Sequence, residues 1–218
     1  MNTALIIHSC DKYNYILPEF FEKFNQFKPD IEKLGIPVWL TTEEKPSELC
    51  ANILTGKGEW STRLKFAINT LPSSVKNIIL FQEDFIVKKI DTKSIEYAIE
   101  VHDAFDYQIT KLASFYEFSL IPKGYTFLEN PIFQQKGGHY TMSHQPVAIF
   151  NKDFLLSTLE TPNDPWHHEC KVTEEINAGK YGEVNICTIG KIYNPNKSDI
   201  IDIHHAIRKG EHYAYTGN

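Results

Sequence analysis

Apolar positions along the chain follow two kinds of pattern. Short continuous apolar runs between polar or turn-forming residues predict buried strands, and they occupy residues 3–9, 36–43, 75–84, 107–114 and 183–190. Segments in which apolar side chains recur every three or four positions predict helices, and they occupy residues 17–27, 60–71, 91–105 and 163–180. A strand that runs directly into a helix is predicted over residues 145–159.

The predicted helices carry residues that are typical of helix ends. Asp91 or Thr92 is expected to cap the helix over residues 91–105, because a short polar side chain accepts from free backbone N–H groups. Asp164 followed by Pro165 suits the start of the last long helix. These caps support the helix assignments made from periodicity.

The order of the elements predicts the fold class. Strands and helices alternate through the first two thirds of the chain, which is typical of an α/β fold with a mostly parallel central sheet and helices on both faces. Residues 44–59 are expected to form a loop, and residues 116–145 a long irregular segment rich in aromatic residues. The 218 residues, 42% of them hydrophobic, suit a single domain with one sizeable core.

Composition excludes several classes of partner. The formal net charge is −6 and no long basic block is present, so duplex nucleic acid is not an expected partner. No run of about 18 apolar residues occurs, so no membrane span is expected. The four cysteines form no C-x-x-C pair, and the N-terminus has neither a basic region nor a small-residue cleavage site. A cytoplasmic protein with reduced thiols is therefore expected.

Two adjacent carboxylates interrupt the apolar run "IILFQEDFIV". Glu83 and Asp84 come at the expected carboxyl end of the third strand, and ligands of α/β sheets bind outside that edge. Because an unpaired buried carboxylate is unstable, we expect a positive partner there. A divalent hard cation such as Mg²⁺ or Mn²⁺ fits, since one or two carboxylates plus substrate phosphates hold it. The alternative is a surface turn in which both side chains are solvated.

Six motifs in this order together resemble those of nucleotide-sugar-dependent glycosyltransferases of the GT-A fold. The resemblance is closest to small domains from bacterial surface-polysaccharide clusters and large algal viruses. The motifs are spread over almost the whole chain: "HSCDKYNY", "WSTRLKFAI", "IILFQEDFIV", "SHQPVAIFNKDFL", "DPWHHE" and "HHAIRKG". The resemblance implies a nucleotide-binding half over residues 1–115 and an acceptor-binding half over residues 116–218.

The resemblance also implies a metal site. The acidic motif of this fold is usually Asp-x-Asp, and its last position corresponds to Asp84. Gln82 departs from the first position, which puts its usual contact in doubt, and Glu83 is the expected substitute. His204 and His205 correspond to a second ligand near the C-terminus. Mn²⁺ or Mg²⁺ is therefore the expected cofactor.

Further residues are assigned to the donor by the same resemblance. Asp11 and Tyr13 follow the first strand, where these folds hold the nucleobase and ribose, and Arg63 corresponds to a helix arginine that faces the nucleotide. Arg208 and Lys209 are expected to neutralise the leaving diphosphate. For each of these residues the alternative is an ordinary turn, cap or solvated side chain.

The acceptor side is expected around "DPWHHE". Glu169 corresponds to the general base of inverting enzymes, at the start of a helix, and the alternative is a first-turn acid that only stabilises the helix. Trp166 is expected to form an apolar wall for a sugar. His167 and His168 are substitutes for the base. The sugar or acceptor pocket is expected to include residues of the irregular segment, namely Tyr140, His144 and Gln145.

These features favour an inverting, divalent-metal-dependent glycosyltransferase. It would move a sugar from a UDP-, dTDP- or GDP-linked donor to a hydroxyl of a glycan or glycolipid, in the synthesis of surface polysaccharide or another glycan. Nucleotidyl transfer is one alternative, although "HSCDKYNY" lacks the glycine-rich basic loop expected for it. A non-catalytic saccharide-binding domain derived from a transferase is another.

Overall fold

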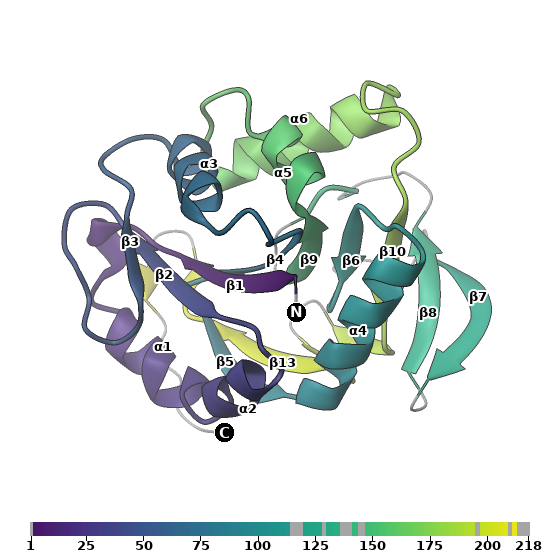
Figure 1. Cartoon of the computed structure of the whole chain (residues 1–218), viewed down its shortest axis with the longest axis horizontal. Coiled ribbons are helices and arrows are strands. Elements are labelled where there is room, and N and C mark those ends of the chain that lie inside the picture. Colours follow the sequence, from purple (N-terminus) through teal and green to yellow (C-terminus); the bar gives the residue numbers. More distant parts are fainter. Residues whose placement is uncertain are drawn as a thin grey trace.

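A nine-stranded central sheet forms the centre of the computed structural model (Figure 1). The structure describes residues 2–113, 120–127, 130–135, 141–143, 147–194, 197–208 and 211–212. The strand order of the central sheet is β3-β2-β1-β4-β9-β6-β10-β8-β7. Its strands are β1 (Thr3–His8), β2 (Val38–Thr42), β3 (Asn52–Leu54), β4 (Asn77–Gln82), β6 (Ile109–Lys111), β7 (Leu120–Phe127), β8 (Asn130–Gln135), β9 (Ala148–Asn151) and β10 (Ile186–Ile189).

Most strands of this sheet run in the same direction, as the alternation of strands and helices predicted, and β8 and β9 run the opposite way. The strand β1 pairs in parallel with both β2 and β4, and β10 pairs in parallel with β6. The strand β9 runs antiparallel between β4 and β6, and Ala148 is opposite both Leu80 and Lys111. The ends of β4 and β6 are therefore level with each other across β9.

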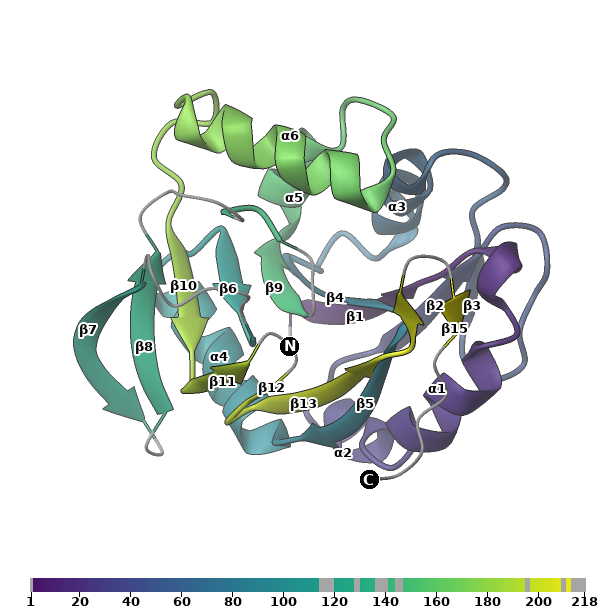
Figure 2. The ribbon, with the colours of Figure 1, turned by 180° about the vertical axis from the view of Figure 1, so that it is seen from behind.

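A second layer lies against one face of the central sheet (Figure 2). It is a four-stranded sheet in the order β11-β12-β13-β5. Its strands are β5 (Phe85–Ile90), β11 (Ile192–Asn194), β12 (Lys197–Ser198) and β13 (Ile201–His205), and a separate hairpin pairs β14 (Ile207–Arg208) with β15 (Glu211–His212). Glu83 and Asp84 form the two-residue connection from β4 of the first sheet to β5 of the second, because β4 ends at Gln82 and β5 begins at Phe85.

Helices cover both faces of the central sheet (Figure 1). On one face lie α3 (Trp60–Thr70), α5 (Lys152–Thr158) and α6 (Pro165–Asn177), and on the other lie α1 (Leu17–Phe24), α2 (Lys28–Lys33) and α4 (Thr92–Ala104), with the short 3-10 helix η1 (Asp11–Tyr13) before α1. None of the described helices is long and apolar enough to cross a membrane.

The alternation of side chains along the central strands builds two cores. In β1, Leu5 and Ile7 join the cluster that contains the phenylalanines of α1, whereas Ala4 and Ile6 join the cluster that contains Leu64 of α3. Successive side chains of a strand point to opposite faces. Continuous apolar runs are required for such a strand, because both faces are buried.

The predicted fold class is confirmed, and so are several local predictions. Asp91 caps α4 by accepting from the backbone N–H groups of Lys93 and Ser94. Asp164 caps α6, and Pro165 is its first residue. Gly179 follows the end of α6 with a φ of 78°, which suits the predicted helix stop.

Two predictions of irregular structure and one prediction of a continuous strand are wrong. Residues 52–54, predicted as loop, form the edge strand β3, whose pairing with β2 supplies order that its short apolar run does not. The segment over residues 116–145 contains the hairpin β7–β8, which pairs with β10 through β8. The predicted strand over residues 75–84 ends at Gln82, so the acid pair forms a turn.

Phe81→Ala tests the core under α1. The Phe81 side chain is fully buried, with its ring centroid 5.9 Å from that of Phe24, so we expect the free energy of unfolding in urea to fall by about 3–5 kcal/mol. Phe66→Ala is the matched control, because this side chain is 48% exposed on α3 and its loss should change stability by about 0.5 kcal/mol or less. Equal losses in the two variants would contradict the assignment of Phe81 to the core.

Candidate functional site

The predicted metal ligand Asp84 lies at the carboxyl edge of the central sheet. Its Oδ2 is 3.0 Å from Nε2 of His205, a residue of β13, and its backbone carbonyl accepts a hydrogen bond of 2.6 Å from the N–H of Ala206. The His205 ring stacks on Phe85, with centroids 4.5 Å apart. The end of β13 therefore contacts the turn that follows β4, through His205 and the adjacent Ala206.

Among the described residues, one oxygen of Asp84 has no partner. Its Oδ1 is buried and accepts no hydrogen bond from any residue that the structure describes, and the buried Nε2 of Gln82 donates none to them. Buried polar atoms are nearly always paired, so an unpaired carboxylate oxygen at this edge suits a ligand. Asp84 and His205 are two of the three metal ligands expected from the sequence, and they contact each other here.

Glu83 is more deeply buried than Asp84. Burial and the negative charge of Asp84 together raise the pKa of Glu83 to about 8, although Arg63 and a hydrogen bond with Ser9 oppose the shift. A carboxyl group in this state is largely protonated at neutral pH. A cation bound beside the pair would favour the ionised form and displace the proton.

Arg63 reaches this edge from α3 and is buried. Its Nη1 donates to the carbonyl of Ser9 at 2.6 Å and its Nε donates to the carbonyl of Gly58 at 3.2 Å. The carboxylate of Glu43 lies 3.8 Å from the same Nε. Arg63 thus joins two loops beside the acid pair, and its positive charge opposes the raised pKa of Glu83.

Asp11 ties the loop after β1 to the loop after β2. Its side chain accepts from the backbone N–H groups of Glu43, Glu44 and Lys45 at 3.1–3.4 Å, and its own N–H donates to Glu43 at 3.0 Å. These contacts match the turn-capping alternative for Asp11. Tyr13 lies in η1 and packs partly buried against the core, with the ammonium of Lys12 5.1 Å from its ring centroid.

Glu169 lies in a second polar cluster under α6. It is the fifth residue of that helix and 3% exposed, so the alternative of a first-turn acid is wrong: Asp164 is the cap and Pro165 is the first helical residue. Ser143 Oγ donates to Glu169 at 3.4 Å. A carboxylate in this position is held inside the protein and not on the helix surface.

Lys111 belongs to the same cluster, and the sequence analysis did not identify it. It ends β6, is fully buried, and donates from Nζ to Oε1 of Gln135 at 2.7 Å. Burial lowers the pKa of Lys111 to about 7, although the negative charge of Glu169 opposes the shift. The available signal was a lysine two residues after Ile109, on the same face of a predicted buried strand.

The other residues of "DPWHHE" have separate roles. His167 is exposed and contacts the cap residue Asp164, and His168 is buried and donates to the carbonyl of Thr158 at 3.1 Å. The His168 ring also lies 5.4 Å from that of Trp60, which joins the starts of α6 and α3. Trp166 is 54% exposed. The two histidines thus have structural contacts, whereas Trp166 presents its ring to solvent.

The structure describes only some of the remaining residues that were predicted to belong to the site. His204 precedes His205 on β13 and therefore projects to the other face of that strand. Arg208 lies in β14. Lys209, Tyr140, His144 and Gln145 lie outside the described residues. Among the residues that are described, no group of three or more His, Cys, Asp or Glu side chains is placed to hold a metal ion.

Comparison with known proteins identifies the fold. No known protein family and no curated protein matches the sequence. Among solved structures, the chain is similar to a cytidylyltransferase from Leptospira borgpetersenii (TM-score 0.52, 12% identity, covering 92% of this chain and 79% of that one). It is also similar to a CMP:2-keto-3-deoxy-manno-octonic acid synthetase (0.52, 13%, 91% and 92%) and a UDP-glucose pyrophosphorylase (0.52, 10%, 94% and 92%). The fold is thus one that nucleotide-using transferases share.

Lys111→Met tests the burial of the ammonium. Between about pH 7 and pH 10.5, the unfolded chain keeps a proton on Lys111 that the folded chain has lost. The free energy of unfolding of the unmodified protein should therefore rise with pH in this window, relative to the variant, by up to about 1.4 kcal/mol per pH unit. Urea denaturation from pH 7 upward measures the difference.

The control for this measurement is Lys33→Met, because Lys33 is exposed on α2. Its pH dependence should match that of the unmodified protein. A parallel pair of curves for Lys111→Met and the unmodified protein would show that the ammonium is solvated in the folded state.

Proposed function

We propose that the protein is a glycosyltransferase that moves a sugar from a nucleoside-diphosphate donor to a glycan or glycolipid hydroxyl. The observation that carries this proposal is the unpaired buried oxygen of Asp84, next to His205, at the carboxyl edge of the sheet. Ligands of open α/β sheets bind at that edge. Synthesis of a surface polysaccharide is the process that the sequence resemblance favours.

Mn²⁺ or Mg²⁺ would be held by Asp84 and His205, with Glu83 as an additional ligand once it loses its proton. When bound, such an ion supplies positive charge that stabilises a leaving diphosphate. Arg63 adds a fixed positive charge next to the acid pair, because burial and two backbone carbonyls hold its guanidinium in place. Arg208 and Lys209 are proposed to neutralise the same phosphates.

Glu169 is the proposed general base. It takes the proton of the acceptor hydroxyl while that oxygen bonds to the anomeric carbon and the bond from this carbon to the diphosphate breaks, with the electron pair leaving on the diphosphate. The configuration of the sugar is inverted in this single displacement. Lys111 lies in the same buried cluster and interacts electrostatically with Glu169. Trp166 is proposed to contact a sugar face, with His144 and Gln145 in the same pocket.

Nucleotidyl transfer is the second candidate. The similar structures are a cytidylyltransferase, a synthetase complexed with CTP and a pyrophosphorylase complexed with UDP-glucose, so the fold suits both reactions. The loop after β1 favours glycosyl transfer, because it has no glycine and is closed by η1 and by the backbone contacts of Asp11. It does not present the row of free backbone N–H groups that cradles a triphosphate.

Donor and metal binding can be tested by thermal shift. We expect one class of UDP-, dTDP- or GDP-sugar to raise the melting temperature, and the rise to be larger with Mn²⁺, because a ligand of the native state stabilises it. Asp84→Asn should remove the part that depends on Mn²⁺. Asp153→Asn, which makes the same change on the exposed surface of α5, should keep it. A panel in which no nucleotide sugar raises the melting temperature would refute donor binding.

Glu169→Gln separates an enzyme from a binding domain. We expect sugar transfer to fall by about 10²–10⁴-fold while the donor-dependent thermal shift is retained. His167→Gln is the control, because His167 is an exposed neighbour on the same helix, and its transfer rate should be unchanged. Full transfer by Glu169→Gln would rule out its role as the base, and release of pyrophosphate from a nucleoside triphosphate plus a sugar phosphate would favour nucleotidyl transfer.

A further inference from the structure

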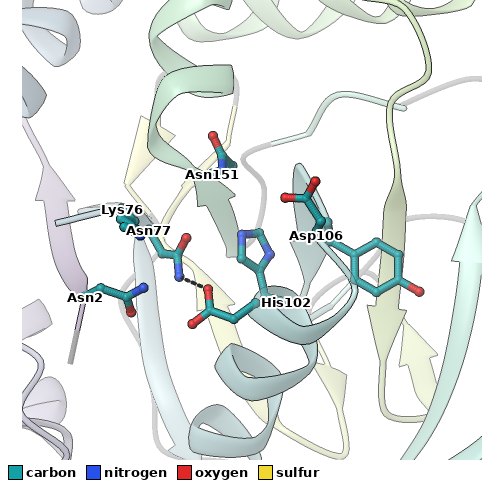
Figure 3. A pocket seen from close by; sticks show the side chains of 8 residues that line it. Asn2, Lys76, Asn77, His102, Asp106 and Asn151 are labelled. Atoms are coloured by element: carbon teal, nitrogen blue, oxygen red, sulfur yellow. Dashed lines mark hydrogen bonds between the residues drawn. The ribbon is translucent and has the colours of Figure 1, made fainter. Parts of the chain in front are cut away.

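A polar pocket lies at the opposite, amino edge of the central sheet (Figure 3). Its volume is about 430 Å³, within the range of roughly 300–1,000 Å³ that is typical of small-ligand sites. It lies between the starts of β1 and β4, the end of α4 and the end of β9. The side chains that line it include Asn2, Lys76, Asn77, His102, Asp106 and Asn151.

His102 is the buried member of this pocket. Its side chain is 2% exposed, and its ring stands between Asn77 and Asp106 (Figure 3). The Nδ1 atom forms a hydrogen bond of 2.9 Å with Thr110, whereas Nε2 is buried without a partner among the described residues. Burial lowers the pKa of His102 to about 4, so the ring is neutral at neutral pH. A neutral ring nitrogen with no partner suits a ligand group that donates or accepts one hydrogen bond.

Acidic residues lie at the C-terminal end of α4, a position where other residue types are more common. Asp106 follows the last turn with a φ of 50°, a left-handed conformation that glycine or asparagine normally provides at this position. Asp103 lies in the last turn and accepts from Nδ2 of Asn77 at 2.7 Å. Carboxylates at a helix C-terminus oppose the helix dipole. These two acids therefore favour a ligand that donates hydrogen bonds to them.

The residues of the pocket disfavour two kinds of ligand, namely phosphate-containing molecules and metal ions. Asp103 and Asp106 outnumber the single ammonium of Lys76, which disfavours phosphates and nucleotides. No cluster of three or more metal-ligating side chains occurs in the described part of the chain, which disfavours a bound metal ion. The expected ligand therefore has no anionic group and can donate hydrogen bonds.

The amides of the pocket complement its carboxylates. The side-chain oxygen Oδ1 of Asn151 caps α5 by accepting from the backbone N–H of Phe154 at 3.0 Å. The Nδ2 of the same side chain is therefore the group left to donate. The pocket thus combines carboxylate acceptors with amide and ammonium donors. A hydroxyl group can donate one hydrogen bond and accept others, and a ligand with several hydroxyls matches such a mixed lining.

We propose that this pocket binds a neutral saccharide through its hydroxyl groups. The site is separate from the acid pair of Glu83 and Asp84, because the two lie at opposite edges of the central sheet. The proposal does not depend on glycosyl transfer. In a glycan-modifying enzyme such a site would hold a sugar of the chain away from the reacting end.

The proposal can be tested on the full chain by NMR of histidine rings. The methyl glycosides of glucose, galactose, mannose and N-acetylglucosamine are added separately. At least one of them should shift the ring resonances of His102 in a saturable manner while those of the exposed His167 stay unchanged. If all four leave the His102 resonances unmoved, or if only inorganic phosphate or calcium chloride moves them, the saccharide proposal is wrong.

Matched variants locate the binding site. Asp106→Asn keeps a residue that tolerates the left-handed conformation and should weaken glycoside binding by about tenfold or more, because a charged acceptor is lost. Asp153→Asn on exposed α5 and Asp84→Asn at the other edge should both leave the dissociation constant unchanged. Binding that Asp84→Asn abolishes and Asp106→Asn preserves would place the sugar at the carboxyl edge and overturn the proposal. If Asp106→Asn does not fold, the His102 shifts of the unmodified protein still decide.

Discussion

Two adjacent carboxylates, Glu83 buried and Asp84 half-buried, in the turn that joins β4 of the central sheet to β5 of the second sheet are the constraint on which the carboxyl edge depends. Neither Glu83 nor Asp84 can be removed from water without compensation. Glu83 is compensated by retaining its proton and by the nearby Arg63, whereas Asp84 is compensated by His205 on one oxygen alone. The difference between the two acids is what makes one of them available for a ligand.

This constraint explains why so many loops meet at one edge. Arg63 must be close to the acid pair, so α3 has to begin beside the end of β1, and the contacts of Arg63 with Ser9 and Gly58 fix that arrangement. Asp11 then joins the loops after β1 and β2. Residues that the sequence marks as ligand contacts can thus serve mainly to hold the frame of a site.

Much of the fold could be predicted from the sequence, because its central strands are buried on both faces. The strand β1 and the helices α3, α4 and α6 follow from continuous apolar runs, helical spacing and caps at Asp91 and Asp164. The strands β3, β7 and β8 could not be predicted, since their order comes from pairing with other strands. Local patterns carry no information about such partners.

Several residues of the candidate site could be predicted from the sequence, but the contacts between them could not. The acid pair and His205 were identified, and the structure brings Asp84 and His205 together. Lys111 was missed, because one lysine in a short strand gives no sign that Gln135 and Glu169 surround it. The capping role of Asp11 was one of two open alternatives, and only the positions of three backbone N–H groups distinguished it.

The contact between Asp84 and His205 joins residues that are 121 positions apart. A ribosome makes the acid pair long before it makes the histidine, so a nascent chain can form β1, β2 and β4 while the turn after β4 still lacks its partner. The carboxyl edge therefore matures later than the strands that form it. A growing chain gains its complete set of polar groups there only after β13 has also left the ribosome.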